Sequence, residues 1–433
     1  MTDHVILGAG PAGVIAAETI RKHAPHDGIT LVGDEAEPPY SRMAIPYLLM
    51  GNIDESGTYL RKSADHFDNL KISQVNDSAS GVDAALKTVT LSNGKVLKFD
   101  RLLIATGSHP ARPPIPGIDS AGVHPCWTLA DARKIMALAQ PSARVLQLGA
   151  GFIGCIIMES LQQRGVQLSV VEMGDRMVPR MMGPMAGGMI RDWCETKGVK
   201  VFTGTRVEAI EPAAKPGGPL TVRLAGGQTV EAELVISATG VKPNIAFLEK
   251  SGITCLQGVL TDECLQTSVP GIYAAGDCAE AFDKVSGKTI VSAIQPNAAE
   301  QARVAALNMV GQRTGLKAVT QINVLDTLGL ISTSFGNWEG VPDGDHVELT
   351  DRSANGGMGR HLSLQFKDDV MVGCNSVGWT DHVGVMRGLV EGAVKLGPWK
   401  DVLKNDPTKL MQAYLGSAQA QGQWSGASDQ RRR

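Results

Sequence analysis

The stretch HVILGAGPAGVIAAETIRKHAPHDGITLVGDE, residues 4–35, decides the fold. An apolar run opens it, a glycine turn follows at residues 8–13, then comes a helical stretch and a second apolar run that ends in Asp34-Glu35. In such a turn the first glycine permits the tight bend, the second lets backbone approach a pyrophosphate, and the third lets helix pack on strand. The order strand, glycine turn, helix, strand, acid therefore predicts a dinucleotide-binding βαβ unit.

The same order returns in RVLQLGAGFIGCIIMESLQQRGVQLSVVE, residues 144–172. Here the glycine turn spans residues 149–154, and the second apolar run ends in Glu172. One glycine turn is weak evidence, because such turns are common. Two of them, each in its strand–turn–helix–strand context, predict two dinucleotide sites whose phosphates meet a helix N-terminus.

Two further strand ends are repeated. LLIATG at residues 102–107 and VISATG at residues 235–240 are nearly identical, which indicates two related halves. A third strand-like run ends in Gly276-Asp277, which is either a plain turn or one that aims a carboxylate at sugar hydroxyls. The proline-rich stretch 108–117 and the residues after Gly240 read as the two crossings between the halves. The predicted fold class is α/β, with two Rossmann-like dinucleotide-binding domains, one inserted in the other, plus a C-terminal α+β domain.

Composition narrows the function classes. The 433 residues are 43% hydrophobic and 20% charged, which excludes a chain that is disordered throughout. Lys and Arg number 41 against 44 Asp and Glu, so the net charge of -3 offers no general attraction to nucleic acid. No segment reaches the roughly 18 apolar residues of a membrane span. The apolar stretch near the N-terminus lacks the basic residues of a signal peptide, so we expect a cytoplasmic protein with no membrane or nucleic-acid partner.

The seven cysteines are scattered and include no C-x-x-C pair. This spacing fits neither a disulfide framework nor a zinc or iron–sulfur site, and it indicates a reducing compartment. We therefore predict no metal site. The cysteines are at positions 126, 155, 194, 255, 264, 278 and 374.

Five motifs in order, GAGPAG, ATGSHP, GAGFIG, ATGVKPN and YAAGDCAE, resemble the pyridine nucleotide–disulfide oxidoreductase family of flavoproteins. The resemblance implies that the first glycine turn holds FAD, that the second holds NAD(P)H, and that Asp277 lies by the flavin ribityl chain. It also implies an FAD domain at residues 1–112 and 244–320, a nicotinamide domain at 113–243 and an interface domain at 321–415. Residues 416–433 are low in apolar residues, and we expect them to be disordered.

The cofactor-binding residues expected from these motifs fall into two sets. For FAD they are Gly8, Gly10, Pro11, Ala12, Gly13, Asp34, Glu35, Arg42, Pro46, Ala79, Ala105, Thr106, Gly107, Gly276, Asp277 and Pro296. For the nicotinamide dinucleotide they are Gly149, Gly151, Phe152, Ile153, Gly154, Glu172, Ala238 and Gly240. Hydride transfer needs no acid or base from the protein, so no catalytic residue is predicted.

Glu172 favours NADH over NADPH. It follows the glycine turn by 18 residues, where a carboxylate accepts bonds from the adenosine ribose and repels a 2′-phosphate. Two nearby arginines, Arg176 and Arg180, would instead favour NADPH if they bind its 2′-phosphate. The alternative is that both are solvated surface charges. On the FAD side Asp34 or Glu35 would take the equivalent ribose role.

Three residues bear on the flavin itself. Arg42 is the cation expected near the flavin or its pyrophosphate, with a surface salt bridge as the alternative. Pro296 and Asn297 precede a predicted helix whose N-terminal dipole would face the flavin pyrimidine edge.

Two departures separate the chain from thiol-using relatives. The run VGDEAEPPYSR resembles the NADH:rubredoxin and ferredoxin reductase branch and assimilatory nitrite reductases, whereas the run at residues 43–47 resembles the C-G-I-P-Y run of coenzyme A disulfide reductases. Met43 stands where those enzymes have the redox cysteine, and a thioether forms no thiolate. Ile156 stands where relatives commonly have a glutamate; Glu159, nearly a turn later, either compensates or is a solvated or ion-paired residue.

The resemblance implies an enzyme that takes hydride from NADH onto FAD and passes electrons to an external rubredoxin- or ferredoxin-type carrier. One alternative is a reductase of a small acceptor, such as oxygen, a quinone, a nitro compound or a sulfur species. Another is an NADH-responsive binding protein that resembles apoptosis-inducing-factor-type flavoproteins, and a homodimer is compatible with each. Three tryptophans of the C-terminal domain would serve either electron exit or packing: Trp338, Trp379 and Trp399.

Overall fold

A computed structural model describes residues 1–212, 215, 218–283, 286–319 and 322–417. They form two compact units. The first contains residues 1–111, 127–132 and 241–319, and the second contains the other described residues. The expected tail lies outside the described residues from 418 onward.

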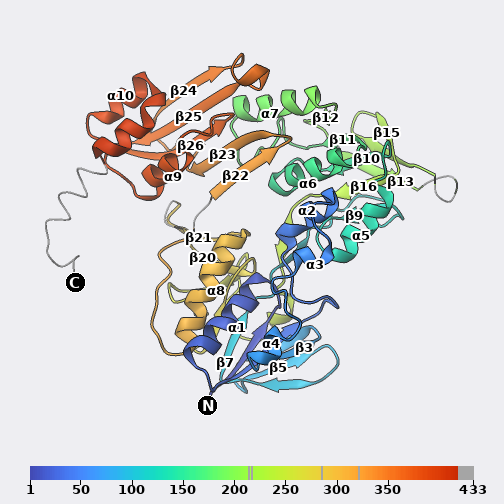
Figure 1. Cartoon of the computed structure of the whole chain (residues 1–433), viewed down its shortest axis with the longest axis vertical. Coiled ribbons are helices and arrows are strands. Elements are labelled where there is room, and N and C mark those ends of the chain that lie inside the picture. Colours follow the sequence, from blue (N-terminus) through green and yellow to red (C-terminus); the bar gives the residue numbers. More distant parts are fainter. Residues whose placement is uncertain (213–214, 216–217, 284–285, 320–321, 418–433) are drawn as a thin grey trace. The chain divides into compact units, whose positions relative to one another are not determined.

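The first unit is built on a parallel sheet of order β19-β7-β1-β2-β3. This is the strand order of a Rossmann half. The strands are β1 (Asp3–Leu7), β2 (Gly28–Gly33), β3 (Ser73–Asn76), β7 (Arg101–Ile104) and β19 (Ile272–Ala274). Figure 1 labels two strands of this sheet, β3 and β7.

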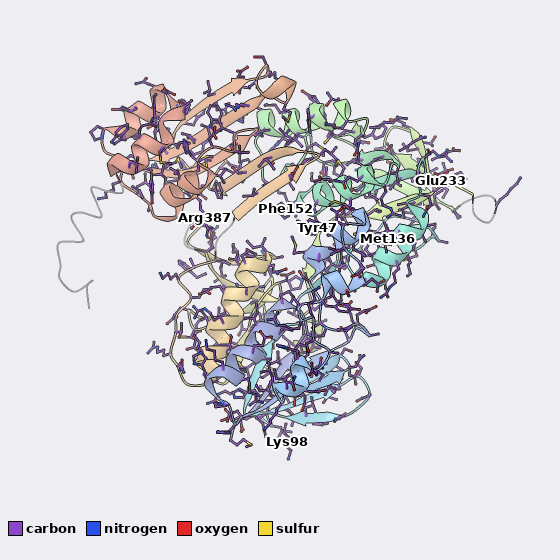
Figure 2. The ribbon with its side chains drawn as sticks, viewed as in Figure 1. Tyr47, Lys98, Met136, Phe152, Glu233 and Arg387 are labelled. Atoms are coloured by element: carbon purple, nitrogen blue, oxygen red, sulfur yellow. The ribbon has the colours of Figure 1, made fainter. Side chains whose placement is uncertain are left out.

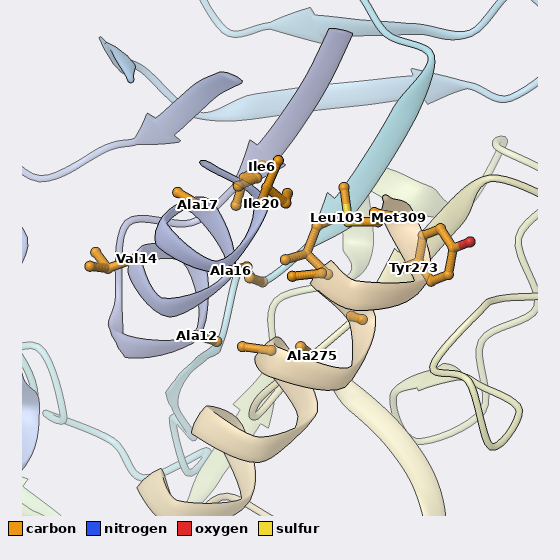
Figure 3. Packing of buried hydrophobic residues seen from close by; sticks show 14 of the residues in the cluster. Ile6, Ala12, Val14, Ala16, Ala17, Ile20, Leu103, Tyr273, Ala275 and Met309 are labelled. Atoms are coloured by element: carbon orange, nitrogen blue, oxygen red, sulfur yellow. The ribbon is translucent and has the colours of Figure 1, made fainter. Parts of the chain in front are cut away.

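Both faces of this sheet are covered, which explains why its strands read as unbroken apolar runs. Ile6 and Leu103 face helices α1 (Pro11–His23) and α8 (Gln295–Met309), whose alanines pack closely together (Figure 3). The alternate residues of the same strands face the hairpins of β4 (Ala79–Asp83), β5 (Thr88–Leu91) and β6 (Val96–Lys98).

Shorter elements complete the first unit. They are η1 (Arg42–Ala44), α2 (Ile45–Met50), α3 (Glu55–Thr58), α4 (His66–Asn69), β8 (Ser108–Pro110), β17 (Val241–Pro243), η2 (Ala246–Leu248), β18 (Val259–Leu260), β20 (Ala279–Asp283) and β21 (Lys288–Val291). Strands β8 and β17 pair antiparallel, so the two crossings predicted from the sequence lie side by side.

The second unit repeats the pattern with a parallel sheet of order β12-β11-β10-β16-β9. Its strands are β9 (Val123–Pro125), β10 (Arg144–Leu148), β11 (Gln167–Val171), β12 (Lys200–Phe202) and β16 (Leu234–Ser237). Its helices are α6 (Phe152–Gln163) and α7 (Pro184–Thr196), and α5 (Leu129–Leu138) begins in the first unit. An antiparallel sheet of β13 (Val207–Glu211), β14 (Leu220–Leu224) and β15 (Thr229–Ala232) covers one face. The prediction of two Rossmann-like units is confirmed.

The C-terminal segment belongs to the second unit. Its antiparallel sheet has the order β22-β23-β26-β25-β24, with β22 (Ile322–Thr327), β23 (Leu330–Gly336), β24 (Asp345–Asp351), β25 (Arg360–Lys367) and β26 (Val370–Val377). The turn η3 (Asn355–Gly357) and the helices α9 (Val383–Glu391), α10 (Trp399–Asn405) and η4 (Pro407–Lys409) complete it. Buried Asn375 ties this sheet to the start of α7, because its amide donates to Met181 O (3.0 Å) and accepts from Gly183 N (2.9 Å). We treated this segment as a separate domain from sequence, and those domain boundaries stay a prediction.

In the described part of the chain, no helix is both long and apolar enough to cross a bilayer.

Candidate dinucleotide-binding sites

The first glycine turn has the geometry of a phosphate cradle. Gly8 has φ +112°, and a Cβ there would collide with the carbonyl oxygen of Ala105. A Cβ on Gly13 would collide with the carbonyl of Gly8, so this position holds helix against strand. A Cβ on Gly10, by contrast, would meet no protein atom within 4 Å. The two outer glycines are therefore required by the protein itself, while the middle one leaves space for a ligand to approach backbone.

The second turn repeats each feature. Gly149 has φ +93°, and its Cβ would lie 2.5 Å from Ala238 O. Gly154 would place a Cβ 2.6 Å from Gly149 O, and Gly151 meets nothing within 4 Å. Phe152 and Ile153 form the first turn of α6, and Phe152 is labelled in Figure 2.

Both helices start without a side-chain cap. Gly10 precedes α1 and Gly151 precedes α6, and neither glycine offers an oxygen to the first N–H groups. These N–H groups and the positive end of the helix dipole are what a pyrophosphate binds. The residues present thus fit one dinucleotide in each unit.

The carboxyl ends of three neighbouring strands bring the predicted FAD residues together. Gly8 follows β1, Ala105 follows β7, and Gly276 follows β19, all at one edge of the sheet. Gly276 has φ +82°, and its N–H donates to the side-chain oxygen of buried Gln301 (2.7 Å). Ligands of open α/β sheets bind at this edge. The set gathered there is Gly8, Gly10, Pro11, Ala12, Gly13, Ala105, Thr106, Gly107, Gly276 and Asp277.

Asp277 is partly buried and accepts a hydrogen bond from Ser108 Oγ (2.8 Å). Burial raises the pKa of this carboxyl, while the bond from Ser108 and the charge of Arg42 work in the opposite direction. The side chain is thus oriented by neighbours on other segments.

The matching edge of the second unit gathers the nicotinamide residues. Ala238 and Gly240 follow β16, and the carbonyl of Ala238 lies against Gly149. Glu172 follows β11; its Oε2 accepts from Ala150 N (2.8 Å) and its Oε1 from Gly174 N (2.8 Å). The carboxylate is therefore fixed beside the glycine turn, where a ribose hydroxyl would meet it.

The two halves differ at this acid. Gly8 N donates to Val32 O, just as Gly149 N donates to Val171 O, so Gly33 occupies the position of Glu172. A Cβ on Gly33 would lie 2.7 Å from the Cβ of Ala9. Asp34 lies one residue beyond and is exposed, and Glu35 lies two residues beyond. Gly33 is thus the residue in register with Glu172, and a ribose role for Asp34 or Glu35 stays a prediction.

Glu35 is engaged by its own segment. Its Oε1 accepts from Arg42 Nη2 (2.7 Å) and Nη1 (3.1 Å), and its Oε2 accepts from the Tyr40 hydroxyl. Arg42 therefore forms a salt bridge with Glu35, and its role toward the flavin or its pyrophosphate stays a prediction. Its guanidinium carbon also lies 5.4 Å from the ring centroid of Trp127, a residue that we did not identify from the sequence.

The other predicted FAD residues lie at different depths. Pro46 is buried in α2, and Ala79 begins β4 and packs beneath the sheet against the cluster of Val5 and Leu7. Pro296 is in the first turn of α8, where the neighbouring Gln295 accepts from Ser41 Oγ (2.7 Å). Asn297 donates to Ser292 Oγ (2.7 Å).

Arg176 is tied to its own turn. It donates to Met182 O (2.8 Å) and Pro179 O (3.3 Å) and pairs with Asp175. Neither reading from the sequence anticipated these bonds. Arg180 is exposed.

All seven cysteines are free thiols. Cys155, Cys194, Cys278 and Cys374 are buried, and burial raises the pKa of each thiol, to about 12 for Cys155 and Cys374. Met43 is 49% exposed. High thiol pKa values disfavour the thiolate that redox chemistry needs. Among the described residues, no cluster of His, Cys, Asp and Glu could hold a metal ion.

Glu159 on α6 is partly buried, and its carboxylate accepts a long bond from Gln163 Nε2 (3.5 Å). Burial raises its pKa, and nearby Asp326 adds to the effect. From the sequence we expected Glu159 to be solvated or ion-paired, but its charged neighbour is another acid, Asp326.

Two of the three tryptophans of the C-terminal segment, Trp379 and Trp399, pack against its core, and Arg360 lies 5.4 Å from the Trp379 ring centroid. This arrangement favours the packing alternative for both.

Comparison with known proteins places these features in a family. Residues 2–305 match the family described as pyridine nucleotide-disulphide oxidoreductase. The NADH-dependent phenylglyoxylate dehydrogenase subunit epsilon of Aromatoleum evansii is 33% identical over 94% of this chain and 95% of its own. The biphenyl dioxygenase system ferredoxin--NAD(+) reductase component of Paraburkholderia xenovorans is 32% identical over 63% of this chain and 66% of its own. Among solved structures, an NAD-dependent persulfide reductase from A. fulgidus has a TM-score of 0.83 and 27% identity, covering 92% of this chain and 78% of its own.

Proposed function

The chain belongs to the pyridine nucleotide-disulphide oxidoreductase family, and we propose that it takes hydride from NADH onto FAD and delivers the electrons to an external rubredoxin- or ferredoxin-type carrier. It is an NAD(P)H oxidoreductase and a flavoprotein. The observation that carries the proposal is the pair of open glycine cradles, one in each unit, combined with seven cysteines that are all free thiols, four of them buried. When bound, FAD supplies the two-electron chemistry, and the protein supplies binding and orientation.

We assign the first cradle to FAD and the second to NADH. The residues proposed to hold FAD are those at the strand ends of the first unit, with Asp277 as the carboxylate for the ribityl hydroxyls. Arg42, whose charge acts on Asp277, is the proposed cation near the flavin or its pyrophosphate. Gly149, Gly151 and Gly154 would take the NADH pyrophosphate, and Glu172 would take the adenosine ribose. The fixed orientation of the Glu172 carboxylate supports this assignment.

The absence of a thiol at position 43 supports an external protein as the electron acceptor. Met43 occupies the position of the redox cysteine in thiol-using relatives, and the buried cysteines have raised pKa values. Reduction of a persulfide or disulfide through a protein thiolate is therefore disfavoured at position 43 and at the four buried thiols. A carrier that takes electrons directly from the flavin needs no such thiolate.

A second candidate is a subunit of a larger dehydrogenase, in which a partner subunit supplies electrons and NAD⁺ receives them. It is favoured by one observation: the similarity to the epsilon subunit spans 94% of the chain, whereas that to the ferredoxin reductase component spans 63%. The same two cradles would serve both directions of hydride transfer.

We also propose that the protein is cytoplasmic, because all seven cysteines are free thiols. A homodimer stays a prediction.

A steady-state panel tests the main proposal. Anaerobic NADH oxidation would be measured with a rubredoxin, a ferredoxin, a quinone and a persulfide, and aerobic oxidation without a carrier. We expect a protein carrier to exceed oxygen and the small acceptors at least tenfold. Rates no higher with carriers would contradict the proposal. Co-purification of the native protein with further subunits of a dehydrogenase, together with NAD⁺ reduction by that complex, would support the second candidate instead.

A further inference from the structure

Trp127 lies in the turn before α5 and contacts two other segments of the first unit. Its indole Nε1 donates to the backbone oxygen of Ser108 (3.0 Å). Its ring faces Arg42, with 5.4 Å between the guanidinium carbon and the ring centroid. The turn is fixed in place by Asp131, whose Oδ2 accepts from Trp127 N (3.3 Å) and Thr128 N (2.9 Å). The indole is therefore held in one orientation.

The guanidinium of Arg42 is held by three further contacts. Glu35 takes both of its terminal nitrogens, and the buried Tyr40 ring lies 5.7 Å from its carbon. The Tyr40 hydroxyl donates to Glu35 and accepts from Leu129 N (3.3 Å), two residues beyond Trp127. A cation between aromatic rings and a carboxylate loses little freedom when a ligand binds it.

Ser108 links this cluster to Asp277. Its backbone oxygen accepts from Trp127, and its hydroxyl donates to Asp277 Oδ2 (2.8 Å). Trp127 thus contacts Arg42 directly and is linked to Asp277 through Ser108.

We propose that Trp127 is a positioning residue of the FAD site, which holds Arg42 by its ring face and Asp277 through Ser108. This inference rests on the proposed assignment of FAD to the first unit. Preorganised charges bind a ligand more tightly, because no free energy is spent on ordering them at the moment of binding. Loss of the indole should therefore weaken FAD binding and leave the second unit unaffected.

The test compares FAD dissociation constants of apoproteins. Trp127→Phe keeps a ring for Arg42 and removes the bond to Ser108, so we expect Kd to rise about fivefold. Trp127→Leu removes both contacts, and we expect a rise of about twentyfold. Trp193→Phe is the matched control: its Nε1 also donates to a backbone oxygen (3.1 Å, Leu328) and Lys197 lies over its ring at 4.3 Å, but it belongs to the second unit. That variant should bind FAD with the wild-type Kd.

A second comparison distinguishes positioning from a general loss of structure. With Arg42→Met present, Trp127→Phe and Trp127→Leu should bind FAD with Kd values within about twofold of each other, because no cation is left for the ring. If the two variants differ in Kd as much with Arg42→Met as they do when Arg42 is present, the inference is overturned. A wild-type Kd in the single variant Trp127→Leu would also overturn it. Urea unfolding of each apoprotein accompanies every Kd, so that a variant which fails to fold is recognised.

The variant Asp277→Asn distinguishes failure of the proposed FAD site from failure of the proposed role of Trp127. If it binds FAD as the wild type does, the proposed FAD site is wrong. If it weakens FAD binding while both Trp127 variants bind normally, the FAD site stands and the role of Trp127 is refuted. KM for NADH should be unchanged in the Trp127 variants once they are saturated with FAD.

Discussion

Glu172 is the residue on which coenzyme preference depends. Its two carboxylate oxygens are held by backbone N–H groups, which leaves the negative charge beside the second glycine turn. Replacement by Gln removes that charge and one acceptor. We predict that the NADH-to-NADPH ratio of kcat/KM falls about tenfold, as charge-assisted bonds of roughly 1.5–3 kcal/mol imply.

Steady-state kinetics with both coenzymes checks this, and Glu195→Gln, an exposed position on α7, is the control for charge alone. An unchanged ratio in Glu172→Gln would remove this residue from the account. Arg176 is engaged by backbone oxygens, so a 2′-phosphate should gain little from it.

At the scale of elements, two glycines of the first turn have different roles: Gly13 is needed for folding, and Gly10 is expected to matter for FAD binding. Gly10 has φ −77° and open space around it, so alanine fits the folded chain but intrudes where a pyrophosphate approaches. We predict that Gly10→Ala keeps the urea midpoint of the apoprotein and binds FAD at least tenfold more weakly. Gly13→Ala should lower the stability itself, by about 3 kcal/mol or more, because its Cβ collides with backbone.

Urea unfolding and FAD titration of the two variants, side by side, measure both effects. Wild-type FAD affinity in Gly10→Ala would refute the cradle at this position. The pair Gly151→Ala and Gly154→Ala repeats the design for NADH in the second unit.

Helix α6 carries an acid, Glu159, whose surroundings disfavour its charged form. Burial and nearby Asp326 raise the pKa of Glu159, so the folded state favours its protonated form. Stability from this group is therefore present below the ordinary carboxyl pKa and is lost as pH rises through the raised value. We predict that Glu159→Gln has a higher urea midpoint than the wild type at pH 7 and no advantage below about pH 4.

Unfolding at the two pH values, with Glu195→Gln as the exposed control, checks the sign. A lower midpoint at pH 7 would contradict this prediction, because it would show that the ionised carboxylate is stabilised in the folded state despite its burial and nearby Asp326.

At the scale of the whole molecule, the two Rossmann-like units could be predicted because their signals are local. Strands buried on both faces are apolar throughout, and glycine is forced where backbone meets backbone, as at Gly8 and Gly149. The family resemblance read from the motifs is likewise confirmed.

Features that depend on distant contacts could not be predicted in this way. The position of Gly33 opposite Ala9, the approach of Trp127 to Arg42, and the place of the C-terminal sheet in the second unit each join segments far apart in sequence. No periodicity or motif encodes such pairs. The roles of the individual site residues stay predictions until cofactor binding is measured.

We propose that the flavin is the two-electron store of this protein, because Met43 stands where thiol-using relatives have the redox cysteine and all seven cysteines are free thiols. Anaerobic titration with NADH, followed by the flavin absorbance, tests it most directly. We predict full bleaching with about one equivalent of NADH per FAD and no earlier band from a thiolate–flavin charge-transfer complex. Consumption of two equivalents per FAD would reveal a hidden disulfide and contradict the account.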